Sequence, residues 1–306
     1  MGELIAGMAG TREGEVLAFA LALLSALAHA TFGAINKGGV DPYLNRGAIN
    51  ICYGLGALPF ALFVFPWPTP GLWAILAGVY IIHLVYEWLQ SAAFEKGDFT
   101  LVYPIARGTG PLLIALGSAA VFGEHLGPWQ WLGVVTLSAA IMGLAVVNLR
   151  QKGLGAEALL GLRSAIAIAL LTGVMIAIYT IWDAYGIRQA TDPFTFLAWF
   201  FVLGGLGFPW VAALRWRRLS PAARPALADL AVRGVFGAVI AYLSFGAVML
   251  ATRLDKVGEA AVLRETSIIF ATAIGVFFFH ERVDGPRLGL ILLILAGAML
   301  VEFGAA

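Results

Sequence analysis

The sequence contains ten apolar stretches of roughly 20 residues each, separated by short polar connections. A helix needs about 20 mostly apolar residues to cross the ~30 Å hydrocarbon core of a bilayer. Backbone polar groups cannot stay unpaired in lipid, and these stretches are too long and too uniformly apolar for barrel strands, so we expect ten membrane-spanning helices. The expected spans are Glu15–Asn36, Gly47–Phe65, Leu72–Phe94, Thr100–Phe122, Trp129–Leu149, Leu162–Tyr185, Pro193–Leu214, Leu230–Thr252, Val257–His280 and Leu288–Phe303.

The composition also indicates lipid surroundings. Hydrophobic residues make up 61% of the chain and charged residues 12%, against about 45–50% and 25% in soluble domains. A net charge of +1 provides no broad basic surface for nucleic acid. The single cysteine, Cys52, allows no intrachain disulfide. The sequence therefore predicts an all-α membrane protein with the lipid bilayer as a partner and no nucleic acid.

The two halves of the chain repeat each other. An Asp-Pro pair precedes the second span and the seventh, and an arginine stands 17 residues before a glutamate in each half. The matching positions are Asp41-Pro42 and Asp192-Pro193, Arg107 and Arg264, and Glu124 and Glu281.

This repeat predicts a first half over residues 1–149, a linker over 150–162 and a second half over 163–306. A five-helix unit repeated in tandem must insert its second copy upside down, which gives two inverted five-helix repeats. Inverted repeats are typical of transporters, because they supply two near-equivalent states that open to opposite sides. We therefore expect alternating access.

The basic residues of the connections predict the orientation. The odd-numbered connections and their edges hold thirteen lysines and arginines, and the other side, with the N-terminus, holds four. We therefore expect the odd connections in the cytoplasm and both termini outside it. No cleaved signal peptide is expected in front of the first span, because Met1–Gly14 has no basic segment. The basic residues of the larger group are Lys37, Arg46, Lys96, Arg150, Lys152, Arg163, Arg215, Arg217, Arg218, Arg224, Arg233, Arg282 and Arg287.

A proline before a Gly-Glu pair, followed by a helix with spaced glycines, resembles the EamA pattern of the drug/metabolite transporter superfamily. In the second half, isoleucine replaces the proline and histidine replaces the first glycine. The resemblance implies a ten-helix bacterial exporter of two EamA units; similar members export amino acids, including aromatic ones, or move other metabolites. The first span lacks the carboxylate that couples protons in short relatives. The pattern is Pro111, Gly123, Glu124, Gly133 and Gly143, then Ile268, His280, Glu281, Gly289 and Gly297.

Polar side chains follow one face of the third span at spacings of 3, 4 and 3 residues. The equivalent eighth span offers only Tyr242 and Ser244. Because such a departure from symmetry suits substrate specificity, we expect the stripe to bind substrate; the alternative is an interhelical hydrogen-bond network. The stripe consists of Tyr80, His83, Glu87 and Gln90, with Tyr86 beside it.

Two arginines lie inside predicted spans. Arg107 is about seven residues into the fourth span, roughly 10 Å deep, where an arginine costs about 2.5–3.5 kcal/mol and should face the bundle interior. Arg264 is its counterpart in the ninth span. They are expected to flank a central cavity as an anion-binding or gating pair. The alternatives are that each arginine snorkels to its nearer surface or pairs structurally with a carboxylate such as Glu265.

Aromatic residues accompany these charges. Tyr103 lies one turn before Arg107, and Tyr179, Trp182 and Asp183 share a face of the sixth span. Aromatic walls with an arginine and a carboxylate suit a zwitterion with an apolar or aromatic side chain. Packing and interfacial anchoring are the alternative explanation.

Other features are expected to be structural. Glu124 and Glu281 end their helices in both halves, which favours a role at the membrane surface. Pro104 and Pro111 should bend or break the fourth span, whereas the ninth span has no proline.

The sequence contains no enzyme motif, no ATP site and no cluster with metal-ligand spacing, so we expect no enzymatic activity and no cofactor. The expected function is export of small metabolites, most plausibly amino acids, across a bacterial inner membrane, through a cavity lined by spans 3, 4, 6, 8 and 9. The alternative is an antiporter of organic anions or phosphorylated metabolites. The sequence does not decide whether the protein forms a homodimer.

Overall fold

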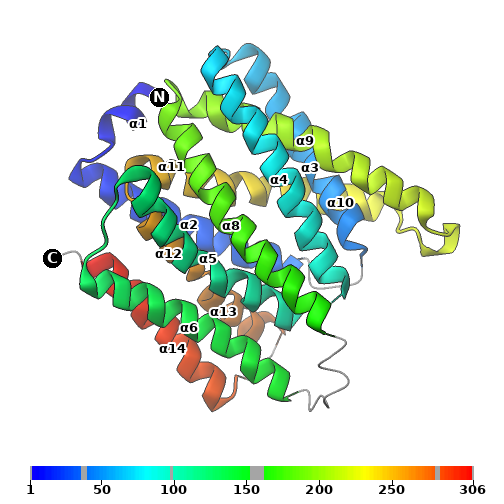
Figure 1. Ribbon diagram of the computed structural model, residues 1–306. Helices are drawn as coiled ribbons and strands as arrows, with labels where there is room; N and C mark the ends of the chain where they lie inside the picture. Colours follow the sequence, from blue (N-terminus) through cyan, green and yellow to red (C-terminus); the bar gives the residue numbers. More distant parts are fainter. Residues whose placement is uncertain (1, 36–39, 97–98, 152–161, 280–282, 305–306) are drawn as a thin grey trace.

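The computed structural model describes all residues except 1, 36–39, 97–98, 152–161, 280–282 and 305–306. The protein is an all-α membrane protein (Figure 1). The helices are α1 Gly2–Met8, α2 Arg12–Ile35, α3 Pro42–Phe63, α4 Pro70–Lys96, α5 Phe99–Phe122, α6 Pro128–Gln151, α8 Arg163–Gln189, α9 Pro193–Arg218, η1 Pro221–Ala223, α10 Leu227–Ala241, η2 Tyr242–Gly246, α11 Ala247–Leu254, α12 Val257–Glu265, α13 Ser267–Phe279 and α14 Gly285–Phe303.

Nine helical segments in the described residues are long and apolar enough to cross a membrane. Each corresponds to one expected span. The remaining expected span, the ninth along the chain, is divided into α12 and α13. The eighth span contains the π-helical segment η2 between α10 and α11. The short helix α1 is an addition to the expected pattern.

The interruption lies in the span without prolines. The expectation was that Pro104 and Pro111 would bend or break α5, and this helix is not broken, because it stays helical through both prolines. α12 ends at Glu265 instead, where the Thr266 hydroxyl donates to the Leu263 carbonyl at 2.6 Å and competes with the helical hydrogen-bond pattern. The interruption is therefore next to the charged residues of α12.

The repeated Asp-Pro pairs begin two equivalent helices. Asp41 accepts hydrogen bonds from the backbone of Tyr43 and Leu44 at the start of α3, and Asp192 accepts one from Phe194 at the start of α9. An aspartate at the N-cap satisfies free backbone donors, and a proline at the first helical position needs no donor partner.

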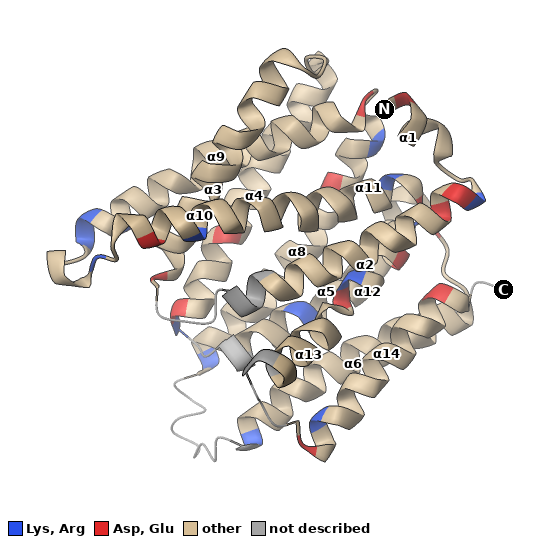
Figure 2. Ribbon diagram, turned by 180° about the vertical axis from the view of Figure 1, so that it is seen from behind, with Lys and Arg blue, Asp and Glu red and all other residues tan. Residues whose placement is uncertain are grey.

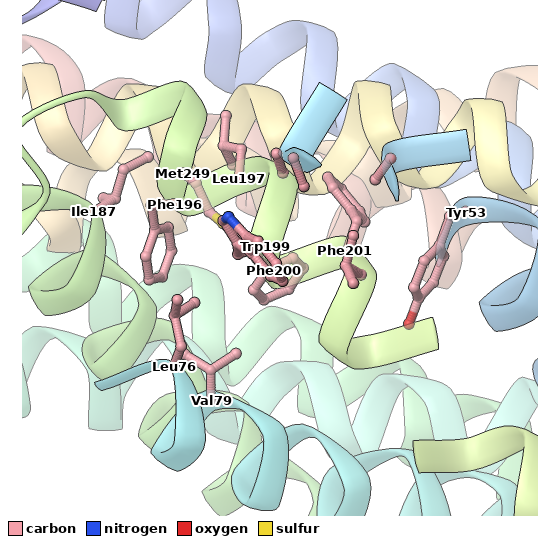
Figure 3. Packing of buried hydrophobic residues seen from close by; sticks show 14 of the residues in the cluster. Tyr53, Leu76, Val79, Ile187, Phe196, Leu197, Trp199, Phe200, Phe201 and Met249 are labelled. Carbon is pink, nitrogen blue, oxygen red and sulfur yellow. The ribbon is translucent and has the colours of Figure 1, made fainter. Parts of the chain in front are cut away.

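Equivalent helices also pack against each other, α3 against α9 and α6 against α14. The first contact is close because a Cβ on Gly54 would stand 2.7 Å from the Gly205 Cα. An apolar cluster fills the space between α3, α4 and α9. Figure 3 shows Phe196, Trp199, Phe200 and Phe201 of α9 in this cluster, with Leu76 and Val79 of α4 and Tyr53 of α3.

The two ends of the bundle carry different connections. The end called the α1 end holds α1, the end of α14 and the connections at 64–69, 123–127, 190–192 and 255–256. The opposite end, called the Arg215 end, holds the start of α3 and the end of α9. Figure 2 shows charged positions at both ends and also within the middle of the bundle.

Candidate functional site

A buried ion pair joins the two halves of the chain inside the bundle. Arg107 of α5 contacts Glu265 of α12 through two nitrogens, Nε at 2.9 Å and Nη2 at 2.7 Å. Both side chains are 4% exposed. Of the predicted alternatives for Arg107, the structural pair with Glu265 is therefore present.

A second charged group surrounds Glu87 of α4. The Glu87 carboxylate accepts hydrogen bonds from Arg46 at 2.7 Å, from Asn50 at 2.8 Å and from Tyr53 at 3.4 Å. From the sequence, Arg46 is expected in a connection, and neither Asn50 nor Tyr53 is a predicted site residue. Their spacing of 4 and 3 residues places all three on one face of α3, and this periodicity could have identified them.

The third group consists of His83 of α4 and Asp183 of α8. The His83 Nε2 lies 2.8 Å from the Asp183 Oδ2, and both side chains are buried. The His83 ring packs against Tyr179 at 4.8 Å and edge-on against Phe200 at 4.8 Å. Tyr86 packs against Tyr179 at 4.7 Å. An aromatic wall therefore surrounds this pair.

Arg264 of α12 is buried beside the same wall. Its guanidinium carbon stands 4.9 Å above the ring of Phe245, and the residue is 4% exposed. Its Nε and Nη2 have no hydrogen-bond partner in the described part of the chain. Arg107 and Arg264, which the sequence treats as equivalents, therefore have different surroundings.

Two narrow pockets adjoin this cluster on the side of the Arg215 end. Their volumes of about 10 and 30 Å³ leave room for one or two water molecules each. His29, Tyr86 and Gln90 line both pockets, and Gln90 donates to the Tyr86 hydroxyl at 2.7 Å. Tyr103 lines the smaller pocket and stacks on His29. His29 was missed because it is an isolated polar residue in an apolar span.

Three predicted site residues lie elsewhere. Tyr80 packs against Gly207 of α9. Trp182 is 36% exposed on the outside of α8 and donates to the Ile75 carbonyl at 3.0 Å. The Tyr242 hydroxyl donates to the Tyr53 carbonyl, and its ring lines an apolar groove of about 390 Å³ between α2, α3, α9 and α11.

Charged contacts between the halves also close the α1 end. Glu124 contacts Arg188 at 2.7 Å and accepts from the Val257 amide at 2.8 Å, and Arg188 also donates to the carbonyls of Thr252 and Asp255. Glu124 thus has the structural position expected of it, whereas its counterpart Glu281 lies outside the described residues.

The opposite end carries a smaller network. Arg215 contacts Asp41 at 2.8 Å and Glu95 at 2.6 Å. These contacts join side chains of the two halves at the Arg215 end.

The described residues contain no group of three or more His, Cys, Asp or Glu side chains that could hold a metal ion. The central cluster instead consists of Arg46, Arg107 and Arg264 with Glu87, Asp183 and Glu265. Three guanidinium groups and three carboxylates give it a formal charge of zero when its histidines are neutral. An interior of this kind, with charges of both signs beside aromatic rings, can bind polar solutes at membrane depth.

Comparison with known proteins agrees with this architecture. No curated protein matches the chain significantly. A solved structure described only as a protein crystal structure is similar, with a TM-score of 0.71 and 19% identity, over 96% of this chain and 99% of that one. This likeness shows the fold alone. The model of the EamA-like transporter family matches residues 163–303. The second half of this membrane protein is therefore similar to a domain of the EamA-like transporter family.

Proposed function

We propose that the protein is a secondary transporter that exports small metabolites, namely amino acids with aromatic or other apolar side chains, by alternating access. The family of its second half indicates transport of small molecules across a membrane. The observation that carries the amino-acid part is the buried central cluster, where charges of both signs lie beside the rings of Tyr86, Tyr179 and Phe245. A zwitterion with an apolar side chain matches both components.

Alternating access is supported by the arrangement of the two halves. Helices that are equivalent in the sequence repeat pack against each other, and the two end networks join side chains from different halves. Breaking one end network while the other stays formed would open the central cluster to one side of the membrane at a time, as alternating access requires.

The proposed setting is a bacterial inner membrane with the Arg215 end in the cytoplasm. The excess of lysine and arginine on that side supports this orientation. Both termini then lie outside the cytoplasm.

An antiporter of organic anions is the second candidate, because three arginines lie in the central cluster. However, Arg46 and Arg107 are already ion-paired with Glu87 and Glu265. A multiply charged phosphate compound would have to displace one of these carboxylates in the interior, where an uncompensated charge is costly. The pairing therefore favours a substrate with no net charge.

Counterflow in proteoliposomes tests the proposal. Purified protein is reconstituted with an excess of one unlabelled solute inside, and uptake of its labelled form is followed for amino acids, organic acids and sugar phosphates. We expect uptake of aromatic or branched-chain amino acids above that of protein-free liposomes. Uptake restricted to organic acids or sugar phosphates would establish the second candidate, and uptake of no solute in the panel would refute both.

A further inference from the structure

Arg264 has unused hydrogen-bond donors and, unlike Arg46 and Arg107, makes no ion pair among the described residues. Two buried nitrogens of Arg264, Nε and Nη2, have no partner among the described residues, and the side chain rests on the Phe245 ring. Buried polar groups in proteins are normally hydrogen-bonded, and a buried charge is normally paired. An arginine fork with free donors is the geometry that receives a carboxylate through two parallel hydrogen bonds.

One carboxylate in the cluster has an unused acceptor. Asp183 contacts His83 through Oδ2, whereas its buried Oδ1 has no partner among the described residues. Glu87 and Glu265, in contrast, are each held by an arginine. A carboxylate oxygen in this position accepts a hydrogen bond from an ammonium group.

The two unused groups border one aromatic cluster. Phe245 lies under Arg264, at 6.3 Å from the Tyr179 ring and 6.4 Å from the His83 ring, and His83 holds Asp183. We propose that Arg264 binds the carboxylate and Asp183 the ammonium group of an α-amino acid, whose apolar side chain contacts these rings. This assignment rests on the proposed function.

The charges of the cluster support a zwitterion over an anion or a cation. With Arg46 and Arg107 paired, Arg264 and Asp183 supply one positive and one negative group to the substrate. A compound that lacks its carboxylate leaves Arg264 without a partner, and one that lacks its ammonium group leaves Asp183 Oδ1 without one. Sites built to hydrogen-bond a substrate group discriminate strongly against analogues without it.

Phe245 connects the proposed groups with the pockets. It lies in the π-helical segment η2, contacts Arg264 and lines the larger of the two pockets. π-Helical segments occur frequently at functional sites. The ring therefore lies at both the guanidinium group of Arg264 and the larger pocket.

Three ligands that differ by one charged group test the assignment. Binding of L-phenylalanine, 2-phenylethylamine and 3-phenylpropionate to the full chain in lipid nanodiscs is measured by calorimetry, and L-leucine, 3-methylbutylamine and 4-methylpentanoate form a second series. For the wild type we expect the amino acid to bind about 10- to 100-fold more tightly than either analogue, as hydrogen bonds to charged groups require.

Each variant should abolish the preference for the amino acid over one of the two analogues only. Arg264→Gln should lower the affinity for the amino acid to that for the amine, while the affinity for the amine stays unchanged. Asp183→Asn should lower the affinity for the amino acid to that for the acid, while the affinity for the acid stays unchanged. The retained ligand shows that each variant is folded. Arg218→Gln, which removes an exposed arginine at the end of α9, should leave all affinities unchanged.

Two outcomes contradict the reasoning at different levels. Equal weakening of all three ligands in a variant, or no weakening of any, would overturn the assignment and leave the proposed function standing. A wild type that binds neither series would refute the proposed function together with the assignment.

Discussion

Glu265 should be the most stabilising carboxylate of the central cluster. It is 4% exposed, contacts Arg107 at 2.7 and 2.9 Å, and also lies within electrostatic range of Arg264. Removing one partner of a buried ion pair costs about 3–5 kcal/mol, because it leaves an uncompensated charge. We expect Glu265→Gln to lower the free energy of unfolding by this amount.

Replacing the arginine should have a smaller effect. In Arg107→Met the carboxylate of Glu265 still has a second guanidinium, that of Arg264, within electrostatic range. We therefore expect its free energy of unfolding to fall by less than that of Glu265→Gln, with a difference of at least about 1 kcal/mol. The double variant Arg107→Met/Glu265→Leu, with an apolar pair of similar volume, should recover to within about 1 kcal/mol of the wild type.

Unfolding by SDS in mixed micelles, followed by circular dichroism, measures these differences. Glu95→Gln is the matched control, because Glu95 pairs with Arg215 where the side chains are 37% and 32% exposed, and pairs of this kind contribute about 0–1 kcal/mol. The reasoning is refuted if Glu265→Gln stays within about 1 kcal/mol of the wild type, or if Arg107→Met is the more damaging of the two single substitutions.

Three further predictions concern the packing of the two halves, the closure of the α1 end and the orientation in the membrane. Gly54→Ala should destabilise the protein by about 1–3 kcal/mol, because the new methyl group meets the Gly205 backbone, whereas Gly71→Ala, with open space around it, should not; SDS unfolding compares the two, and equal effects would contradict the packing. Arg188→Gln should loosen the α1 end, so that a cysteine at Ala261 in a Cys52→Ser background reacts faster with an impermeant maleimide from outside; an unchanged rate would exclude Arg188 from the closure. A C-terminal alkaline phosphatase fusion should be active in a bacterial host and a green fluorescent protein fusion dark, and the reverse result would invert the proposed orientation.

The fold was accessible from the sequence because its determinants are local. Hydrophobic length alone located the spans, and the Asp-Pro pairs located the starts of α3 and α9, since both signals act within a few residues. The interruption at Thr266 was missed because it depends on one hydroxyl and one carbonyl. Proline, which removes a backbone donor wherever it stands, was the stronger local signal and indicated the wrong helix.

The candidate site was accessible only in part because pairing between distant helices has no local signature. The third-span periodicity identified His83 and Glu87, but their partners Asp183 and Arg46 lie 100 and 41 residues away. Trp182 shares a helix face with Asp183 in the sequence, yet it lies on the outside of α8, because a large aromatic side chain is tolerated in contact with lipid.

The two equivalent arginines differ because of the residue that follows each one. Arg264 precedes Glu265, whereas Arg107 precedes Gly108, where a side chain would collide with Met142. The repeat thus supplies two guanidinium groups and one carboxylate at this level of the bundle. If the proposed inverted halves exchange their surroundings during transport, Glu265 can compensate only one of the two arginines in either state. One guanidinium then stays available to the substrate carboxylate throughout the cycle, which a second glutamate at position 108 would prevent.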